Sequence, residues 1–97
     1  MKDLIVKELR KGSLTRYQLS ELTHKSDRTN REMIAEINSA PCGKYGDVLI
    51  IATSDRKGYR LAEDEDDIKH FINERRKRAE NILIPVNKAE RMLRELE

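Results

Sequence analysis

Residues 25–31 combine side chains that are suited to reading the edges of nucleic-acid bases. Arginine can donate two parallel hydrogen bonds to a guanine, and asparagine can bond to an adenine in a similar way. Serine and threonine hydroxyls contact phosphates, and a threonine methyl group can touch a thymine methyl. The candidate DNA-contacting residues of this segment are Lys25, Ser26, Asp27, Arg28, Thr29, Asn30 and Arg31.

A second basic segment, residues 55–61, has the composition of a tight turn that leads into a strand. Arg56 and Lys57 at the tip of this turn can reach backbone phosphates or enter a minor groove. We expect Gly58 to supply the backbone freedom that the turn needs. Tyr59 should anchor the strand in the core, which leaves Arg60 exposed on the alternate face.

Hydrophobic spacing and capping residues predict three helices before this turn. The first covers residues 2–11, with Gly12 as its C-terminal cap. The second covers residues 16–23 and is introduced by a capping box between Thr15 and Gln18. The third runs from Ser26 as N-cap to about Asn38. The residues expected to face inward are Leu4, Ile5, Leu9, Leu19, Leu22, Met33, Ile34 and Ile37.

Residues 48–52 form the most strand-like run of the chain, and residues 59–61 are expected to return as the partner strand. The predicted order of elements is therefore helix, helix, helix, strand, strand. This order, within residues 1–62, predicts an α+β fold of the winged-helix kind: a three-helix core with a two-stranded wing.

Residues 63–97 are expected to form a long C-terminal helix. Five consecutive acidic residues at 63–67 complement the positive end of a helix dipole and indicate a helix start rather than a metal site. From Ile68 onward, one stripe repeats in alternating steps of four and three residues, which is a heptad repeat interrupted by Arg75. Pro85 should kink the helix or divide it in two. The stripe residues assigned to a dimerisation coiled coil are Ile72, Ala79, Ile82, Val86, Ala89, Leu93 and Leu96.

The alternative for this stripe is a helix whose first turns pack on its own domain and whose end frays. Self-association is preferred, because a domain of about sixty residues has no obvious surface for the last apolar residues to cover. A third possibility is that the stripe binds another protein.

Charge is distributed unevenly along the chain. Residues 1–62 carry 12 Lys and Arg against 8 Asp and Glu, a net charge of +4, whereas residues 63–97 carry 8 against 10, a net charge of −2. The first part is therefore the better candidate for an anionic partner. A single cysteine, Cys42, rules out an intramolecular disulfide and favours a reducing compartment. With no apolar run of about 18 residues, we expect a cytoplasmic protein without a membrane partner.

Catalysis is not expected from this chain. His24 and His70 belong to no recognisable nucleophile or metal motif, and Cys42 has no adjacent base. Gly43 and Gly46 lack the lysine and hydroxyl residue that follow in a phosphate-binding loop. The sequence predicts no enzyme, no cofactor, no metal site and no small-molecule ligand.

Two sets of residues resemble the winged-helix DNA-binding domains typified by the N-terminal domain of biotin repressor. The helix pair of that family has Leu-x-x-Leu, a turn and Ser-x-x-Thr-x-x-x-x-Ile; this chain has Leu19-Ser20-Glu21-Leu22, Ser26-Asp27-Arg28-Thr29 and Ile34. The wing of the family ends in Lys-Gly-Tyr-x-Leu, and residues 57–61 have that pattern. Where the family has apolar residues after the turn and after the threonine, this chain has Lys25 and Asn30.

The resemblance implies a sequence-specific binder of double-stranded DNA that regulates transcription, similar to stand-alone regulators of bacteria or bacteriophages. The apolar stripe of residues 68–96 adds the expectation that this binder is a dimer. Asp27, Arg28, Asn30 and Arg31 would read bases, and Ser26, Thr29, Arg56 and Lys57 would hold the backbone. The alternative function is a winged-helix adaptor that binds protein, for example in a phage replication or assembly complex.

Overall fold

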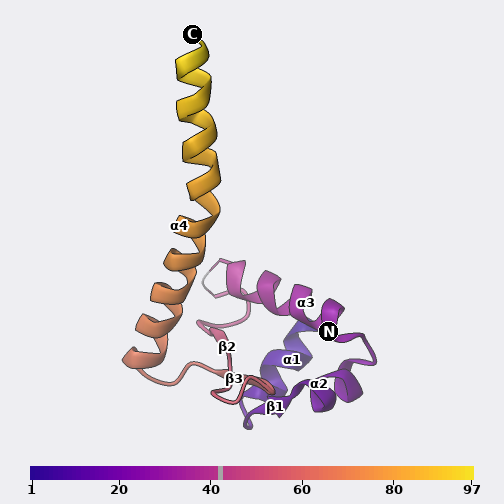
Figure 1. Ribbon diagram of the computed structural model, residues 1–97. Coiled ribbons are helices and arrows are strands. Elements are labelled where there is room, and N and C mark those ends of the chain that lie inside the picture. Colours follow the sequence, from indigo (N-terminus) through magenta and orange to yellow (C-terminus); the bar gives the residue numbers. More distant parts are fainter. Residues whose placement is uncertain (42) are drawn as a thin grey trace. The chain divides into compact units, whose positions relative to one another are not determined.

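Helices and short strands alternate in the first two thirds of the chain, and one long helix forms the rest. The computed structural model describes residues 1–41 and 43–97, so the predictions about Cys42 lie outside the described residues. The elements in chain order are α1 (Lys2–Leu9), β1 (Leu14–Thr15), α2 (Arg16–Thr23), α3 (Asp27–Ser39), β2 (Ile50–Ala52), β3 (Gly58–Leu61) and α4 (Glu65–Leu96) (Figure 1). They group into two units, Met1–Glu63 and Asp64–Glu97.

The first unit confirms the predicted α+β class and adds one strand to it. β3 is central in a three-stranded antiparallel sheet of order β1-β3-β2. On one side of β3, Leu14 pairs with Tyr59 and Thr15 with Gly58; on the other side, Ile50 pairs with Leu61. The first strand was not predicted, because two residues between helices are too short for an alternating pattern.

Local capping signals placed two of the three helices well. Thr15 accepts a hydrogen bond from the backbone N–H of Gln18 (3.0 Å), and the Gln18 side chain accepts one from the Thr15 N–H (2.9 Å), so the capping box is confirmed. Ser26 caps α3 as predicted. The first helix instead ends at Leu9 with Arg10 as its cap, so the prediction of Gly12 as cap was wrong.

One face of each of α1, α2 and α3 packs against the sheet in a small core. Tyr59 is buried there, as predicted, whereas Leu4, Leu22 and Met33 are only partly covered. Asn38 ties α3 to β2, because its side-chain amide donates to the Ile50 carbonyl (3.0 Å) and accepts from the Ile50 N–H (2.9 Å). The buried hydrophobic residues are Ile5, Val6, Leu9, Leu19, Ile34, Ile37, Ile50 and Tyr59.

The second unit is the helix α4. Asp64 caps it by accepting from the Asp67 N–H (2.8 Å), and Glu65, Asp66 and Asp67 occupy its first turn, which confirms the predicted helix start. The helix continues through Pro85, so it is not divided in two, and Figure 1 shows a bend along its length. No described helix combines the length and apolarity needed to cross a membrane.

Candidate nucleic-acid interface

The N-terminal end of α3 is organised by its cap. The Ser26 hydroxyl accepts from the Thr29 N–H (3.2 Å) and lies 3.1 Å from the Thr29 hydroxyl, to which it donates. Both hydroxyls are therefore engaged within the cap and fix the first turn of the helix. Lys25, directly before the cap, is exposed, and its N–H bonds to the Thr23 hydroxyl (3.2 Å).

Two arginines project from this end of α3. The Arg28 side chain is 86% exposed and lies 3.4 Å from Glu32, while Arg31 lies 3.2 Å from Asp27. Asp27 is also 3.4 Å from Arg16 of α2. Asp27 thus bridges two guanidinium groups, which restricts their positions while leaving the surface basic on balance.

The structure contradicts the prediction that Asn30 faces outward. This side chain is fully buried: its carbonyl oxygen accepts from the Thr23 hydroxyl (2.7 Å), and its amide donates to the Ser20 hydroxyl (3.1 Å). These bonds join α3 to α2 where the family pattern has an apolar contact. Asn30 therefore holds the helix pair together and is not available to a base.

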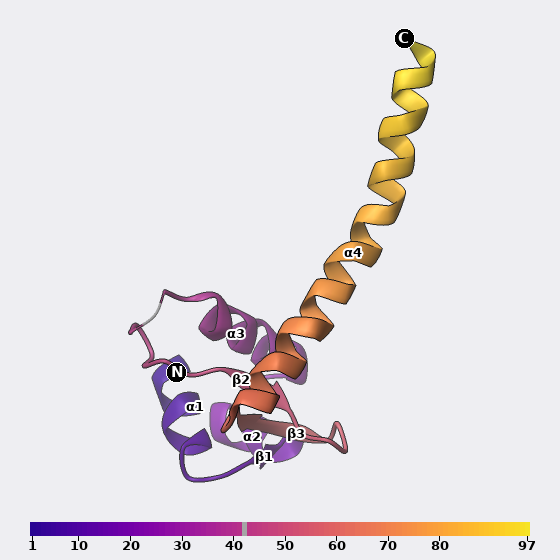
Figure 2. The same ribbon diagram turned by 90° about the vertical axis from the view of Figure 1, so that its left-hand side faces the viewer.

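The loop between β2 and β3 is a turn built around Asp55. The Asp55 carboxylate accepts from the Thr53 hydroxyl (2.5 Å) and from the Lys57 N–H (2.9 Å), and these hydrogen bonds lower the pKa of Asp55. Arg56 at the tip has a positive φ of 60°. Arg56 and Lys57 are both exposed, on a loop that projects beyond the strands (Figure 2).

Gly58 is needed for a different reason from the one predicted. Its φ is not positive; the left-handed position of the turn belongs to Arg56. A Cβ on Gly58 would instead collide with the carbonyl oxygen of Leu14 and lie 2.8 Å from the Cα of Thr15. The glycine therefore allows β1 to approach β3 closely.

The turn and the helix pair meet at the start of α2. The Arg16 N–H donates to the Lys57 carbonyl oxygen (2.9 Å), and the Arg16 guanidinium lies 5.7 Å from the centre of the Tyr59 ring. Burial raises the pKa of Tyr59, and the charges of Arg16, Asp27 and Arg31 also act on its hydroxyl. The base of the β2–β3 hairpin and the front of α3 therefore share one cluster of charged groups.

Sequence reasoning missed two residues of this surface, Arg16 and Tyr17. Arg16 joins the charge cluster just described, and the Tyr17 side chain next to it is exposed. The resemblance to a helix-turn-helix offered a signal, because in that family the first helix of the pair crosses the DNA backbone and its first turn corresponds to these two residues.

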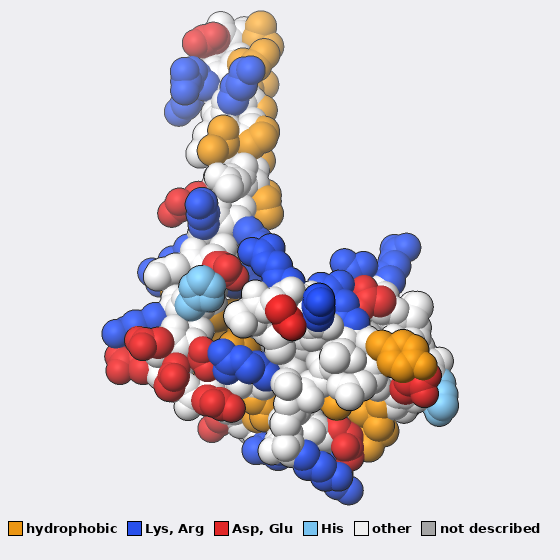
Figure 3. All heavy atoms as spheres, turned by 60° about the horizontal axis from the view of Figure 1, so that its bottom comes forward, with side chains coloured by type: hydrophobic (Ala, Val, Ile, Leu, Met, Phe, Trp, Pro, Cys, Tyr) orange, Lys and Arg blue, Asp and Glu red, His pale blue; other side chains and the backbone are white. Residues whose placement is uncertain are grey.

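The stripe on α4 is a second candidate surface, and it is apolar. None of the α4 side chains is buried; Ile82 is 70% exposed and Leu96 is 84% exposed. Figure 3 shows hydrophobic side chains along one side of this helix. The assigned residues Ile72, Val86 and Leu93 are exposed too, as are Ala79 and Ala89.

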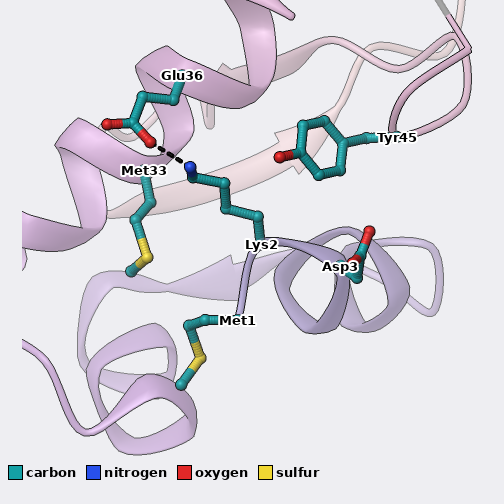
Figure 4. A pocket seen from close by; sticks show the side chains of 6 residues that line it. All are labelled: Met1, Lys2, Asp3, Met33, Glu36 and Tyr45. Atoms are coloured by element: carbon teal, nitrogen blue, oxygen red, sulfur yellow. Dashed lines mark ion pairs between the residues drawn. The ribbon is translucent and has the colours of Figure 1, made fainter.

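An open depression of about 420 Å³ lies elsewhere on the first unit, between α1, α3 and the loop after α3. Lys2 forms an ion pair with Glu36 across it, as Figure 4 shows, and this hydrogen bond raises the pKa of Lys2. Because Lys2 and Glu36 already pair with each other in this open depression, it gives no argument for a ligand. Among the described residues, no group of His, Cys, Asp and Glu is arranged to hold a metal ion.

The chain matches no protein-family model, no curated protein and no solved structure. Its function must therefore be argued from its own residues.

Proposed function

We propose that this chain is a winged-helix protein of the biotin-repressor type that binds double-stranded DNA sequence-specifically and regulates transcription as a dimer. The observation that carries the proposal is the hydrogen bond from the Arg16 N–H to the Lys57 carbonyl oxygen. Together with the pairing of β1 and β3, it fixes the basic hairpin tip to the helix pair. Helix front and hairpin tip can then contact one duplex together, α3 in the major groove and the tip on the adjacent backbone.

The proposed role of each residue follows from how exposed its side chain is and from which groups it already bonds. Arg28 is the most exposed arginine of α3 and is the first candidate for a guanine edge, with Arg31 beside it. Asp27 orients Arg31 and Arg16. Lys25, Arg16, Arg56 and Lys57 are assigned to backbone phosphates, and Ser26 and Thr29 to fixing the start of α3. Asn30 is removed from the base-reading set because it is buried.

The hairpin tip is well suited to phosphate contacts. The Asp55 carboxylate is already bonded to Thr53 and to the Lys57 backbone, so it holds the loop while the two basic side chains stay exposed. A loop that is ordered before binding loses less conformational entropy when it meets a phosphate.

The adaptor alternative has one observation in its favour. Each arginine of the α3 front is near an acid, Arg28 with Glu32 and Arg31 with Asp27. These carboxylates weaken the attraction to phosphates and would suit a protein partner that carries both signs of charge. DNA binding is preferred because, among the described residues, the side chains of Arg56 and Lys57 at the tip form no ion pair, and the charge of Lys57 acts on the nearby Asp55 carboxylate without one.

The proposed dimer would form through the apolar stripe of α4. Exposed Ile, Leu and Val side chains at heptad spacing lose contact with water when a second helix covers them. One DNA-binding unit per chain would then give two half-sites per dimer.

Selection of bound sequences from random duplex DNA tests the proposal. We expect an enriched consensus, and we expect the Arg28→Ala variant to lose preference at one position of it. A matched Glu21→Ala variant, at an exposed position on α2, should keep the consensus. Recovery of unselected sequence by the wild-type protein would overturn sequence-specific binding.

A further inference from the structure

The heptad positions of α4 carry charges that change sign along the helix. The core positions a and d are taken by the stripe, with Ile72, Ala79, Val86 and Leu93 at a, and Ile68, Arg75, Ile82, Ala89 and Leu96 at d. The flanking e positions are Lys69, Arg76, Leu83, Glu90 and Glu97. This e series reads base, base, leucine, acid, acid, so its charges invert about Leu83.

From this symmetry, we infer that two copies of α4 pair as an antiparallel coiled coil centred near Leu83. The inference rests on the proposed self-association of α4 and adds its direction. In an antiparallel pair, the e positions of the two helices face each other, and charges at these flanking positions set orientation. Arg76 would then face the partner's Glu90, and Lys69 would face the partner's Glu97.

The same alignment accounts for Leu83, an exposed leucine outside the a and d stripe. At the centre of the pair, Leu83 would contact the partner's Leu83. The two side chains would extend the apolar contact at the point where the flanking charges change sign.

The core layers also favour this direction. In an antiparallel pair, an a residue lies level with a d residue of the other helix. Ile82 then meets the partner's Val86, and Ile72 meets the partner's Leu96. Arg75 would lie level with the partner's Leu93, where its aliphatic stem covers apolar surface while the guanidinium reaches water.

A parallel pair in register has none of these advantages. Its e positions would face g positions, which are Phe71, Arg78, Pro85 and Met92 and contain no acid. Two Arg75 side chains would share one core layer, with like charges in contact. In the chain alone, moreover, no ion pair engages Arg76 or Glu90 among the described residues, so both charges are available to a partner.

Antiparallel pairing would attach the two Met1–Glu63 units of the dimer far apart along the coil. Each is attached at the N-terminal end of its own α4, so the two attachment points lie at opposite ends of the coil. The core layers, such as Ile82 level with the partner's Val86, are centred on residue 84. With a rise of about 1.5 Å per residue, the two Glu65 positions are therefore about 57 Å apart along the axis.

Distances between spin labels on the full chain test the direction. Labels are placed at Asn73→Cys or at Glu80→Cys, each in a Cys42→Ser background; both positions are exposed and occupy the same heptad position. Antiparallel pairing predicts axial separations of about 33 Å at residue 73 and about 12 Å at residue 80. Equal distances at both positions would show parallel pairing, and absence of any intermolecular distance would show a monomer; either result overturns the inference.

A charge exchange provides a second measurement that needs no label. Arg76→Glu should weaken dimerisation roughly tenfold in sedimentation equilibrium, because it turns attraction into repulsion at two symmetric sites. Combining Arg76→Glu with Glu90→Arg should restore it, while Lys77→Glu, on the outer face, should change little. Failure of the double variant to recover would contradict the antiparallel pairing. These readouts contain no DNA, so they can fail or succeed independently of DNA binding.

Discussion

The backbone N–H of Arg16 donates a hydrogen bond to the carbonyl oxygen of Lys57 at 2.9 Å. This bond links the first residue of α2 to the tip of the β2–β3 hairpin, and the β1–β3 pairs continue the connection. These contacts hold the hairpin tip at a set distance from α3 within the folded first unit. Changes that loosen this join should affect DNA binding without touching a proposed DNA contact.

Replacement of Gly58 by alanine tests that connection. The added Cβ would collide with the Leu14 carbonyl, so we expect the free energy of unfolding to fall by about 1–3 kcal/mol in a urea titration. DNA affinity at fixed salt should fall as well, because β1 must move away from β3. Ser54→Ala, an exposed change in the same turn, should stay within about 0.5 kcal/mol of the wild type. An equally stable Gly58→Ala protein would contradict the close approach.

The Asn30→Ala variant should lose about 1–3 kcal/mol of stability, because it leaves the buried Thr23 hydroxyl without its acceptor. Thermal or chemical unfolding of the purified protein gives the value. Glu21→Ala serves as the exposed control on α2. An Asn30→Ala protein that unfolds like the wild type would contradict the stabilising role of this buried hydrogen bond.

Asp55 predicts a dependence of stability on pH. Its pKa in the folded protein is lowered by hydrogen bonds from Thr53 and from the Lys57 N–H. The stabilisation is therefore fully present above the unfolded value of about 3.9 and is lost as the pH falls through the lower folded value. The gap in unfolding free energy between the wild type and Asp55→Asn should narrow below about pH 3.9. A gap that stays constant across this range would contradict the role of the carboxylate.

The Arg56→Gly variant separates stability from binding. Glycine accepts the positive φ of this position without strain, so the variant should be more stable by about 0.5 kcal/mol. It also removes a proposed phosphate contact, so DNA affinity should fall. Lys7→Ala, at an exposed basic position on α1, controls for the loss of one charge. Unchanged affinity in Arg56→Gly would remove the hairpin tip from the interface.

Much of the fold follows from short-range signals in the sequence. Thr15 with Gln18, and Ser26 with Thr29, mark helix starts because their bonds close within one turn. What could not be predicted depends on contacts across the fold. Gly58 and Asn30 are examples, since only the approach of β1 and the position of Thr23 explain them.

For the candidate interface too, residues recognisable by type were predicted, whereas a residue that depends on contacts across the fold was missed. The most exposed arginine of α3, Arg28, and the tip residues Arg56 and Lys57 were identified from residue type and spacing, and they are exposed. Arg16 was missed because its link to the cluster runs through Asp27 and the Lys57 carbonyl, neither of which is near it in sequence.

Fluorescence anisotropy with a labelled mixed-sequence duplex, titrated at several salt concentrations, tests the central claim most directly. We predict binding at about 50 mM salt that weakens steeply by about 200 mM, since Lys and Arg contacts release counterions from the phosphates. In Lys57→Ala, the slope of log affinity against log salt should become shallower by about one, while Lys7→Ala should leave it unchanged. No binding by the wild-type protein at about 50 mM salt would contradict DNA binding and favour the adaptor.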